Sequence, residues 1–286
     1  LLSMKAARFD YHVHESHSRD ARESTVQLYI EAAEARGIEE ICFTTHLITT
    51  GPDVDLGIRD HEIEGYVNNI HELNETTDVH LKPGLEIDYI KGNQSRVERV
   101  IEEFNWDFIL GSVHLVGKWD VGSRKRSPGF FDGRPLVEAT HDYYVLYKEA
   151  IETGYFDMMS HPDYWRRYIH QKHTEAARWE DYSDACLESI DALKSYDMGV
   201  EVNTSGRRHA HGIQYPIREF LVAVYDTGIR KMNIGSDSHL PEHLGFWLPE
   251  AVEMLKGVGF KHITSFSGRN AIMNPIDSVV RTVKNR

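Results

Sequence analysis

Histidine and carboxylate side chains recur where the predicted strands of this chain end. In "FDYHVHESHSRD" at 9–20, His12 and His14 are two residues apart, so a strand would place both on the same side. Imidazole and carboxylate donors together suit Zn²⁺, Mn²⁺ or Fe²⁺ better than Ca²⁺ or Mg²⁺. The polar residues at the predicted strand ends are, in chain order, His12, His14, His46, Glu86, His114, His161, Asn203, Asp237 and His239. This pattern predicts a metal centre.

The number of these donors indicates more than one ion. Six of them are histidines and two are carboxylates, which exceeds what a single ion needs. We therefore expect two or three divalent transition metal ions, and Glu86 could bridge two of them. Ions grouped in this way are suited to phosphoester hydrolysis, because one activates water while the others neutralise charge on the phosphoryl oxygens.

The elements that would position these residues alternate along the chain. Short β-branched or aromatic runs are followed by longer amphipathic runs, and the run at 24–37 begins with Ser and Thr and ends with Gly, as helices do. Strands are predicted at 8–13, 39–45, 80–87, 107–113, 155–160, 198–203 and 231–236, and helices at 24–37, 58–75, 94–104, 136–152, 175–196, 216–227 and 241–256. The stretch 117–135 is rich in glycine, proline and charge, so we expect a long loop there without a regular element.

Alternating units of this kind predict a parallel sheet, either closed into a barrel or spread as an open doubly wound sheet. Both arrangements bring the carboxyl ends of the strands to one face, where function resides. We expect a single domain over residues 1–286, with residues 1–3, before Met4, as a remnant outside the natural chain.

Composition narrows the function classes. The chain carries 32 Lys and Arg against 45 Asp and Glu, a formal net charge of −13, which argues against general binding of a nucleic-acid backbone. No apolar run approaches the length of a membrane span. The two cysteines, Cys42 and Cys186, fit a reducing compartment, so we expect a cytoplasmic protein. The sequence does not indicate an oligomeric state.

The ordered succession HxH, H, E, H, H, DxH resembles the metal motifs of the PHP (polymerase and histidinol phosphatase) superfamily across nearly the whole chain. The stretches "DYHVH", "GSVHLVGKWD", "EVNTSGRR" and "GSDSHLPEHLG" are similar to the histidinol-phosphatase family in particular. The resemblance implies a distorted seven-stranded (β/α)7 TIM-like barrel with a trinuclear metal site. It also implies a phosphomonoesterase of histidine biosynthesis that hydrolyses L-histidinol phosphate.

The resemblance further implies how the ligands divide among three ions. His12, His14, Glu86 and Asp237 would hold the first ion, and Glu86, His114 and His161 the second. His46 and His239 would hold the third, together with one residue from the loop after the HxH motif. We favour Asp20 for that position over His17, which would then face the substrate or the solvent. Glu86, Asp237 and Arg208 are the expected catalytic residues.

Phosphate recognition calls for arginine, whose guanidinium can grip a phosphate through two hydrogen bonds. Arg208, after "NTSG", matches the phosphate-contacting arginine of the family, and Arg166 or Arg167 is the second candidate. Arg207 stands where an apolar residue is expected, so either Arg207 or Arg208 could point inward. Further candidate substrate contacts are Asn203, His209 and His211, with Asp88 and Asp163 as candidates for a cationic amine.

Two alternatives remain at this point. One is a PHP-type phosphoesterase acting on another small phosphate or a nucleotide. The other is a metal-binding module without catalytic activity, against which the completeness of the ligand set argues.

Overall fold

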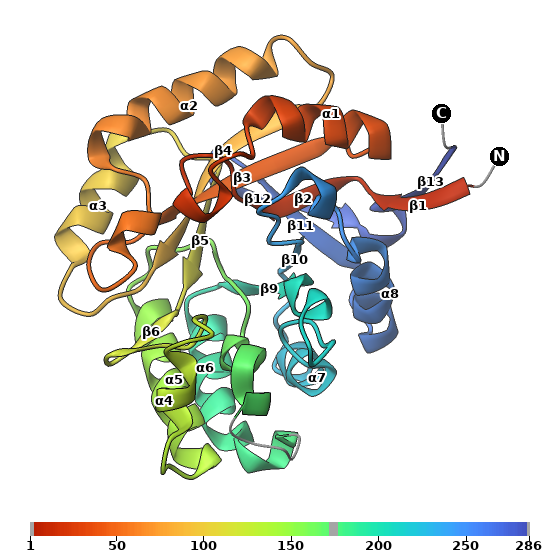
Figure 1. Ribbon diagram of the computed structural model, residues 1–286. Coiled ribbons are helices and arrows are strands. Elements are labelled where there is room, and N and C mark those ends of the chain that lie inside the picture. Colours follow the sequence, from red (N-terminus) through yellow and green to blue (C-terminus); the bar gives the residue numbers. More distant parts are fainter. Residues whose placement is uncertain (1–2, 172–176, 285–286) are drawn as a thin grey trace.

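The computed structural model describes residues 3–171 and 177–284, and its centre is a sheet of seven parallel strands (Figure 1). The strands follow the order β10-β9-β8-β5-β4-β3-β2. Their bounds are β2 Phe9–Val13, β3 Glu40–Leu47, β4 His80–Asp88, β5 Phe108–Ser112, β8 Met158–Met159, β9 Gly199–Asn203 and β10 Met232–Gly235. The core strands are buried on both faces, as parallel strands covered by helices must be.

The sheet closes on itself between its two edges. The His14 N–H donates to the Ser238 carbonyl at 2.8 Å, and the Ser238 N–H donates to the His12 carbonyl at 3.1 Å. Next to this seam, the buried carboxylate of Asp10 on β2 accepts the N–H groups of Ser236 and Gly245, both at 2.9 Å. The fold is therefore the distorted seven-stranded barrel, and the open-sheet alternative is wrong.

Helices surround the barrel on its outer side (Figure 1). The first helix, α1, lies within the predicted range 24–37 and has the predicted start and stop signals: the Thr25 hydroxyl accepts the Leu28 N–H at 3.3 Å, and Gly37 ends the helix with φ +72°. The helices are α1 Val26–Arg36, α2 Asp60–Asn74, α3 Gln94–Glu103, α4 Ser127–Phe131, α5 Leu136–Glu152, α6 Ser183–Ser195, α7 Arg218–Asp226 and α8 Leu248–Val258. None of them, in the part of the chain that the structure describes, has the length and apolar character that a membrane crossing requires.

The stretch 117–135 is more ordered than predicted. A hairpin of β6 Leu115–Val116 and β7 Trp119–Asp120 turns at Gly117, whose φ is +62°. Helix α4 follows and packs under the Trp119 ring, where a Cβ on Gly129 would lie only 2.4 Å from the ring. The expectation of a loop without regular elements was wrong, because glycines that break a pattern here permit a tight turn and a close helix contact.

Other differences concern the ends of elements and the C-terminal region. Helix α8 starts at Leu248, after a 3-10 turn at Pro241–His243, and α6 starts at Ser183; residues 175 and 176 of the helix predicted at 175–196 lie outside the described residues. Two antiparallel pairs were not predicted. They are β1 Ser3–Ala7 with β13 Val280–Lys284, and β11 His262–Ser267 with β12 Asn270–Pro275.

Candidate metal centre

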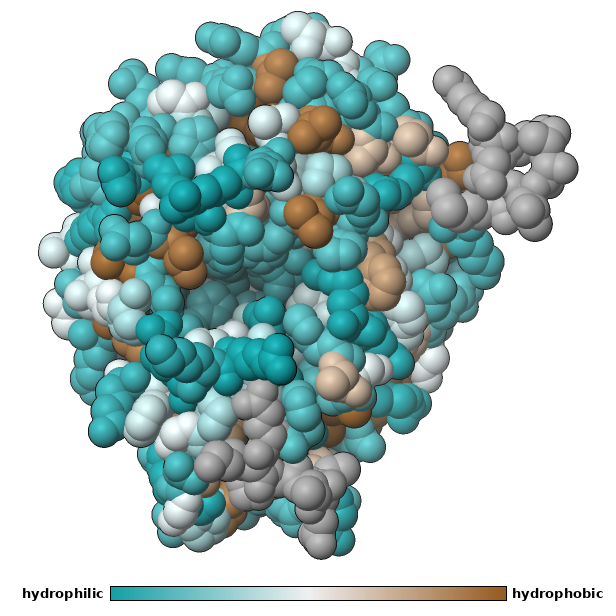
Figure 2. Space-filling view, in the orientation of Figure 1, coloured by the Kyte–Doolittle hydropathy of each residue, from teal (hydrophilic) through white to brown (hydrophobic). Residues whose placement is uncertain are grey.

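A cavity of about 480 Å³ opens at the carboxyl ends of the barrel strands. Figure 2 shows it as a hollow with a largely hydrophilic surface. The cavity lining includes six of the predicted strand-end residues: His46, Glu86, His114, His161, Asp237 and His239. The barrel topology thus brings residues from distant parts of the sequence onto one surface, as the sequence predicts.

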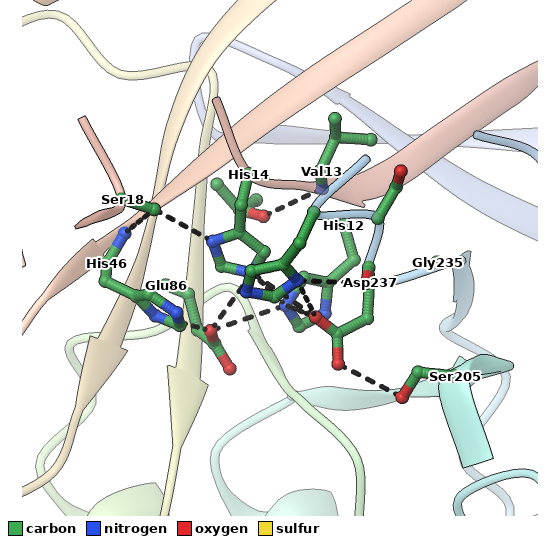
Figure 3. Close-up of polar contacts among 12 residues, drawn as sticks. His12, Val13, His14, Ser18, His46, Glu86, Ser205, Gly235 and Asp237 are labelled. Carbon is green, nitrogen blue, oxygen red and sulfur yellow. Dashed lines mark hydrogen bonds and ion pairs between the residues drawn. The ribbon is translucent and has the colours of Figure 1, made fainter. Parts of the chain in front are cut away.

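Glu86, at the end of β4, lies at the centre of the histidine cluster (Figure 3). Its Oε2 is 3.0 Å from His46 Nδ1 and 3.4 Å from His12 Nε2. Its Oε1 is 2.8 Å from His161 Nε2 and 3.5 Å from His114 Nε2. His46 and Glu86 are partners in the register of β3 and β4, which explains their proximity. Oε2 also lies 3.5 Å from His14 Nε2, so the two carboxylate oxygens face different imidazoles.

Asp237, just after β10, supplies a second carboxylate on the other side of the cluster (Figure 3). Its Oδ1 lies 3.4 Å from His14 Nε2 and 3.4 Å from His239 Nδ1. Asp237 has φ +52°, a left-handed conformation that costs free energy for a residue with a side chain. The surrounding contacts hold this conformation, which aims the carboxylate at the histidines.

Asp20, and not His17, lies beside His46 and His239. The Asp20 Oδ2 is 3.2 Å from His239 Nε2 and 3.5 Å from His46 Nε2. Burial works to raise the pKa of Asp20, but these two imidazoles hold it well below its usual value. The His17 ring instead contacts the Glu15 carboxylate at 3.0 Å, outside the cluster. The geometry thus favours Asp20 as the loop residue.

Among the described residues, the donor atoms form three overlapping groups of three, and the atoms of each group lie within 4.8 Å of one another. The groups are His12, His14 and Asp237; His12, Glu86 and His161; and His14, His46 and His239. His12 and His14 each belong to two groups, which differs from the division that the family resemblance implies. The donors are close enough for several ions, and their division among ions remains a proposal.

The chemistry of the donors fits divalent transition metals. Burial lowers the pKa of His114 to about 3, against the opposing charge of Glu86, and burial also lowers the pKa of His14 well below its usual value. Burial alone would raise the pKa of Glu86, but the imidazoles of His12 and His114 hold it well below the usual range. Against the effect of burial, nearby carboxylates raise the pKa of His12 and of His46 well above the usual value. The cluster therefore combines imidazole nitrogens with ionised carboxylates, which is the ligand set of such ions.

Arg208 points into the cavity and Arg207 does not. The Arg208 guanidinium donates to the carbonyls of Ser236 and Asp237, both at 2.9 Å, and lines the cavity beside the cluster. Arg207 donates to Gln214 Oε1 and lies 4.0 Å from the centre of a tryptophan ring. The contacts of Arg207 therefore hold it away from the cavity.

Of the adjacent arginines Arg166 and Arg167, only one faces the cavity. Arg167 lines the cavity and donates to the Tyr164 hydroxyl, and its Nε has no hydrogen-bond partner among the described residues. Arg166 is buried outside the cavity, where it donates to the Ala177 carbonyl and the Tyr182 hydroxyl. Of the arginines that the structure describes, Arg167 and Arg208 line the cavity and can meet an anion there.

Several predicted substrate contacts lie elsewhere. Asn203 is fully buried, its amide nitrogen is 3.2 Å from a Glu201 oxygen, and it does not line the cavity; its contact with substrate stays a prediction. Asp163 accepts the Tyr144 hydroxyl and a backbone N–H, and does not line the cavity. Asp88 and His209 do line it, whereas His211 contacts a tyrosine hydroxyl outside it. Burial raises the pKa of Asp88 to about 8.

The sequence reasoning missed other residues of this region. The Ser18 hydroxyl contacts His14 Nδ1 at 3.1 Å and accepts the His46 N–H at 3.0 Å, so it fixes two cluster residues (Figure 3). Asp53 and Asp120 also line the cavity, and both pair with Arg126. Ser18 and Asp53 come from loops and Asp120 from the two-residue strand β7, where no periodic pattern signals a role.

A parallel barrel with histidine and carboxylate donors at its strand ends defines a metal-dependent type of site. The sequence profile of the PHP domain matches residues 10–205, and the chain belongs to this family. It is 28% identical over 248 residues to a probable histidinol-phosphatase of Deinococcus radiodurans, covering 84% of this chain and 90% of that protein. It is 26% identical over 265 residues to the histidinol-phosphatase of Lactococcus lactis, covering 91% and 95%.

Solved structures share the fold. The crystal structure of histidinol phosphate phosphatase from Lactococcus lactis, complexed with zinc, L-histidinol and phosphate, superposes with a TM-score of 0.79 at 23% identity, covering 93% of this chain and 99% of that chain. A putative histidinol phosphatase from Listeria monocytogenes has a TM-score of 0.68 at 16% identity, covering 85% and 99%. The predicted superfamily and barrel are confirmed.

Proposed function

We propose that this protein is a metal-dependent phosphomonoesterase that hydrolyses L-histidinol phosphate to L-histidinol and phosphate. One observation carries this proposal: a single cavity combines the histidine and carboxylate cluster with two inward-facing arginines, Arg167 and Arg208. The curated relatives named histidinol-phosphatase, matched along most of their length, support the choice of substrate.

The residues of the cluster would hold divalent transition metal ions: His12, His14, Asp20, His46, Glu86, His114, His161, Asp237 and His239. Ions bound there supply Lewis acidity, which polarises phosphoryl oxygens and makes water a better nucleophile at neutral pH. We propose two or three ions, chosen from zinc, manganese and iron, because these nine donors exceed what a single ion needs.

The protein's own residues orient the substrate. Arg208 is held by two carbonyls, so its remaining N–H groups are directed before the phosphate arrives, and Arg167 adds a second cation at the cavity wall. Both stabilise charge that grows on the phosphoryl oxygens during transfer. No protein nucleophile is required, and Cys42 and Cys186 are buried away from the cavity.

The cavity also offers carboxylates to a cationic leaving group. Asp53 and Asp120 line it and share one arginine, Arg126, whereas Asp88, whose pKa burial raises to about 8, is mostly protonated at neutral pH. Negative charge there favours the ammonium group of L-histidinol and opposes the extra phosphates of a nucleotide. A biosynthetic enzyme acting on this small metabolite would work in the cytoplasm, which is the location we propose.

The test is hydrolysis by metal-loaded protein of a panel of phosphomonoesters that includes L-histidinol phosphate, p-nitrophenyl phosphate, phosphoserine and a nucleoside monophosphate. We expect kcat/KM to be highest for L-histidinol phosphate. A large preference for another ester would contradict the substrate assignment alone. The absence of turnover for every ester would contradict the phosphatase assignment.

A further inference from the structure

We propose that Glu201 is a positioning residue that sets the metal affinity of the centre by fixing the tautomer of His12 and the place of His161. This inference rests on the proposed metal-dependent function. Glu201 lies on β9 and does not line the cavity, so it acts through the ligands and not on the substrate.

The Glu201 carboxylate connects two cluster residues from different strands. It is fully buried, and its Oε1 is 2.7 Å from His12 Nδ1, the ring nitrogen that faces away from the cluster. Its Oε2 accepts the backbone N–H of His161 at 3.1 Å. One side chain therefore holds a ring from β2 and the backbone at the end of β8 in fixed relation.

The hydrogen bonds around Glu201 determine which nitrogen of His12 carries the proton. Asn203 Oδ1 accepts the Ser205 N–H at 3.0 Å, so the amide nitrogen of Asn203 must face Glu201 and Asp237. That nitrogen is a donor, so it cannot accept a proton from His12 Nδ1, although it lies 3.3 Å away. Glu201 is left as the acceptor for an Nδ1–H.

The consequence is that the other nitrogen of His12 is free to bind metal. With the proton on Nδ1, the lone pair of Nε2 is directed into the cluster, 3.4 Å from Glu86 Oε2 and 3.1 Å from His14 Nε2. A carboxylate that accepts the outer N–H of a metal-binding histidine fixes the ring and makes it a stronger ligand.

The neighbouring strand leaves room for this contact. In the barrel, β10 lies between β9 and β2, and Gly235 of β10 lies against both the Glu201 carboxylate and His12. A Cβ at Gly235 would lie 2.1 Å from Glu201 Oε1 and 2.3 Å from the Cβ of His12. Only glycine lets the carboxylate pass across β10 to the histidine.

Two other cluster histidines, His14 and His114, have no carboxylate hydrogen bond to their Nδ1 atoms. His14 Nδ1 contacts the hydroxyl of Ser18 at 3.1 Å, and His114 Nδ1 is 3.7 Å from the nearest Asp88 oxygen, beyond hydrogen-bond distance. His12 Nδ1, by contrast, lies 2.7 Å from the buried carboxylate of Glu201, a contact that His14 and His114 lack. We infer that His12 is the most strongly held ligand of the three.

The decisive experiment measures the affinity of metal-free protein for Zn²⁺ and Mn²⁺, by chelator competition, in wild type and Glu201→Gln. Glutamine keeps the shape but places an NH₂ group against either His12 Nδ1 or the donors from His161 and Asn203. We expect the affinity to fall by about 10- to 100-fold, the range typical for the loss of such a partner.

Asp157→Asn is the matched control. Asp157 is a largely buried carboxylate that accepts the Ile109 N–H and pairs with Arg269, away from the cavity. Its variant should bind metal like wild type, so a fall in both variants would overturn the proposal. A folded Glu201→Gln protein with wild-type affinity would also overturn it. Circular dichroism of the metal-free proteins reports whether each variant is folded.

A second measurement on the zinc-loaded wild-type protein does not depend on the variant folding. Histidine ¹⁵N spectra, assigned to His12 through its backbone resonances, should show a protonated Nδ1 and a metal-bound Nε2. The opposite tautomer would overturn the inference. A wild-type protein that binds neither metal would overturn the proposed function and this inference together. Equal metal affinities of wild type and Glu201→Gln would overturn the inference alone.

Discussion

Substitution of Arg208 by alanine should selectively damage phosphate recognition. The guanidinium of Arg208 has five N–H donors, and two hydrogen bonds to the Ser236 and Asp237 carbonyls leave three N–H groups for a ligand. It also lies 5.3 Å from the centre of the Phe246 ring, which further restricts it. The group is therefore already oriented, and little free energy is lost in ordering it when the phosphate binds.

The magnitude follows from the bonds at stake. A hydrogen bond to a charged group contributes roughly 1.5–3 kcal/mol, so one strong bond or two weaker bonds to the phosphate amount to about 3 kcal/mol. At about 1.4 kcal/mol for each factor of ten, kcat/KM for L-histidinol phosphate should fall roughly 150-fold in Arg208→Ala. The assay is steady-state release of inorganic phosphate, with metal content measured on the same samples.

Arg207→Ala is the matched control, because the adjacent arginine binds Gln214 outside the cavity. Its kcat/KM should stay within about threefold of wild type, since it removes no contact with the phosphate. The reasoning is refuted if Arg208→Ala retains wild-type kcat/KM, or if Arg207→Ala is the more damaging of the two while both bind metal normally.

Three further changes test other parts of the account. Asp20→Asn should lower the metal content of the protein, whereas His17→Ala should leave it unchanged; the reverse pattern in elemental analysis would assign the loop ligand to His17. Asp10→Ala leaves two or more buried N–H groups unpaired, so the free energy of unfolding measured in urea should fall by roughly 3–5 kcal/mol; a loss below about 1 kcal/mol would contradict its role at the barrel seam. Hydrogen bonds and ion pairs with Arg99 and Arg96 lower the pKa of Asp60 in the folded protein. Asp60 therefore adds to the free energy of unfolding at any pH above its pKa in the unfolded chain, and this contribution is lost as the pH falls through its lower pKa in the folded protein. Asp60→Asn should therefore reduce stability at pH 7, with a difference from wild type that narrows towards pH 3.

The convergence of the cluster could be predicted because parallel topology has few solutions. Once β-α units alternate, the strand ends must meet, so His46 and Glu86 become neighbours without any knowledge of the register. The period of two placed His12 and His14 together for the same reason. These predictions depend on regular elements, whose geometry is nearly independent of the rest of the sequence.

The alternatives that the sequence left open concern residues on irregular backbone. Whether Asp20 or His17 faces the cluster depends on the path of a 3-10 turn at Arg19–Ala21. Arg166 and Arg167 lie on another irregular 3-10 segment, where a shift of one residue reverses which side chain faces inward. Glu201 could have been found, because it is two residues before Asn203 on one strand and so shares its side.

The most direct test of the central claim is the dependence of hydrolysis on bound metal. Chelator-treated protein, shown by elemental analysis to be free of transition metals, is assayed with L-histidinol phosphate before and after titration with Zn²⁺, Mn²⁺ or Fe²⁺. The account predicts no turnover without metal and recovery that saturates as the sites of the cluster fill. Full activity in protein that holds no metal would contradict it.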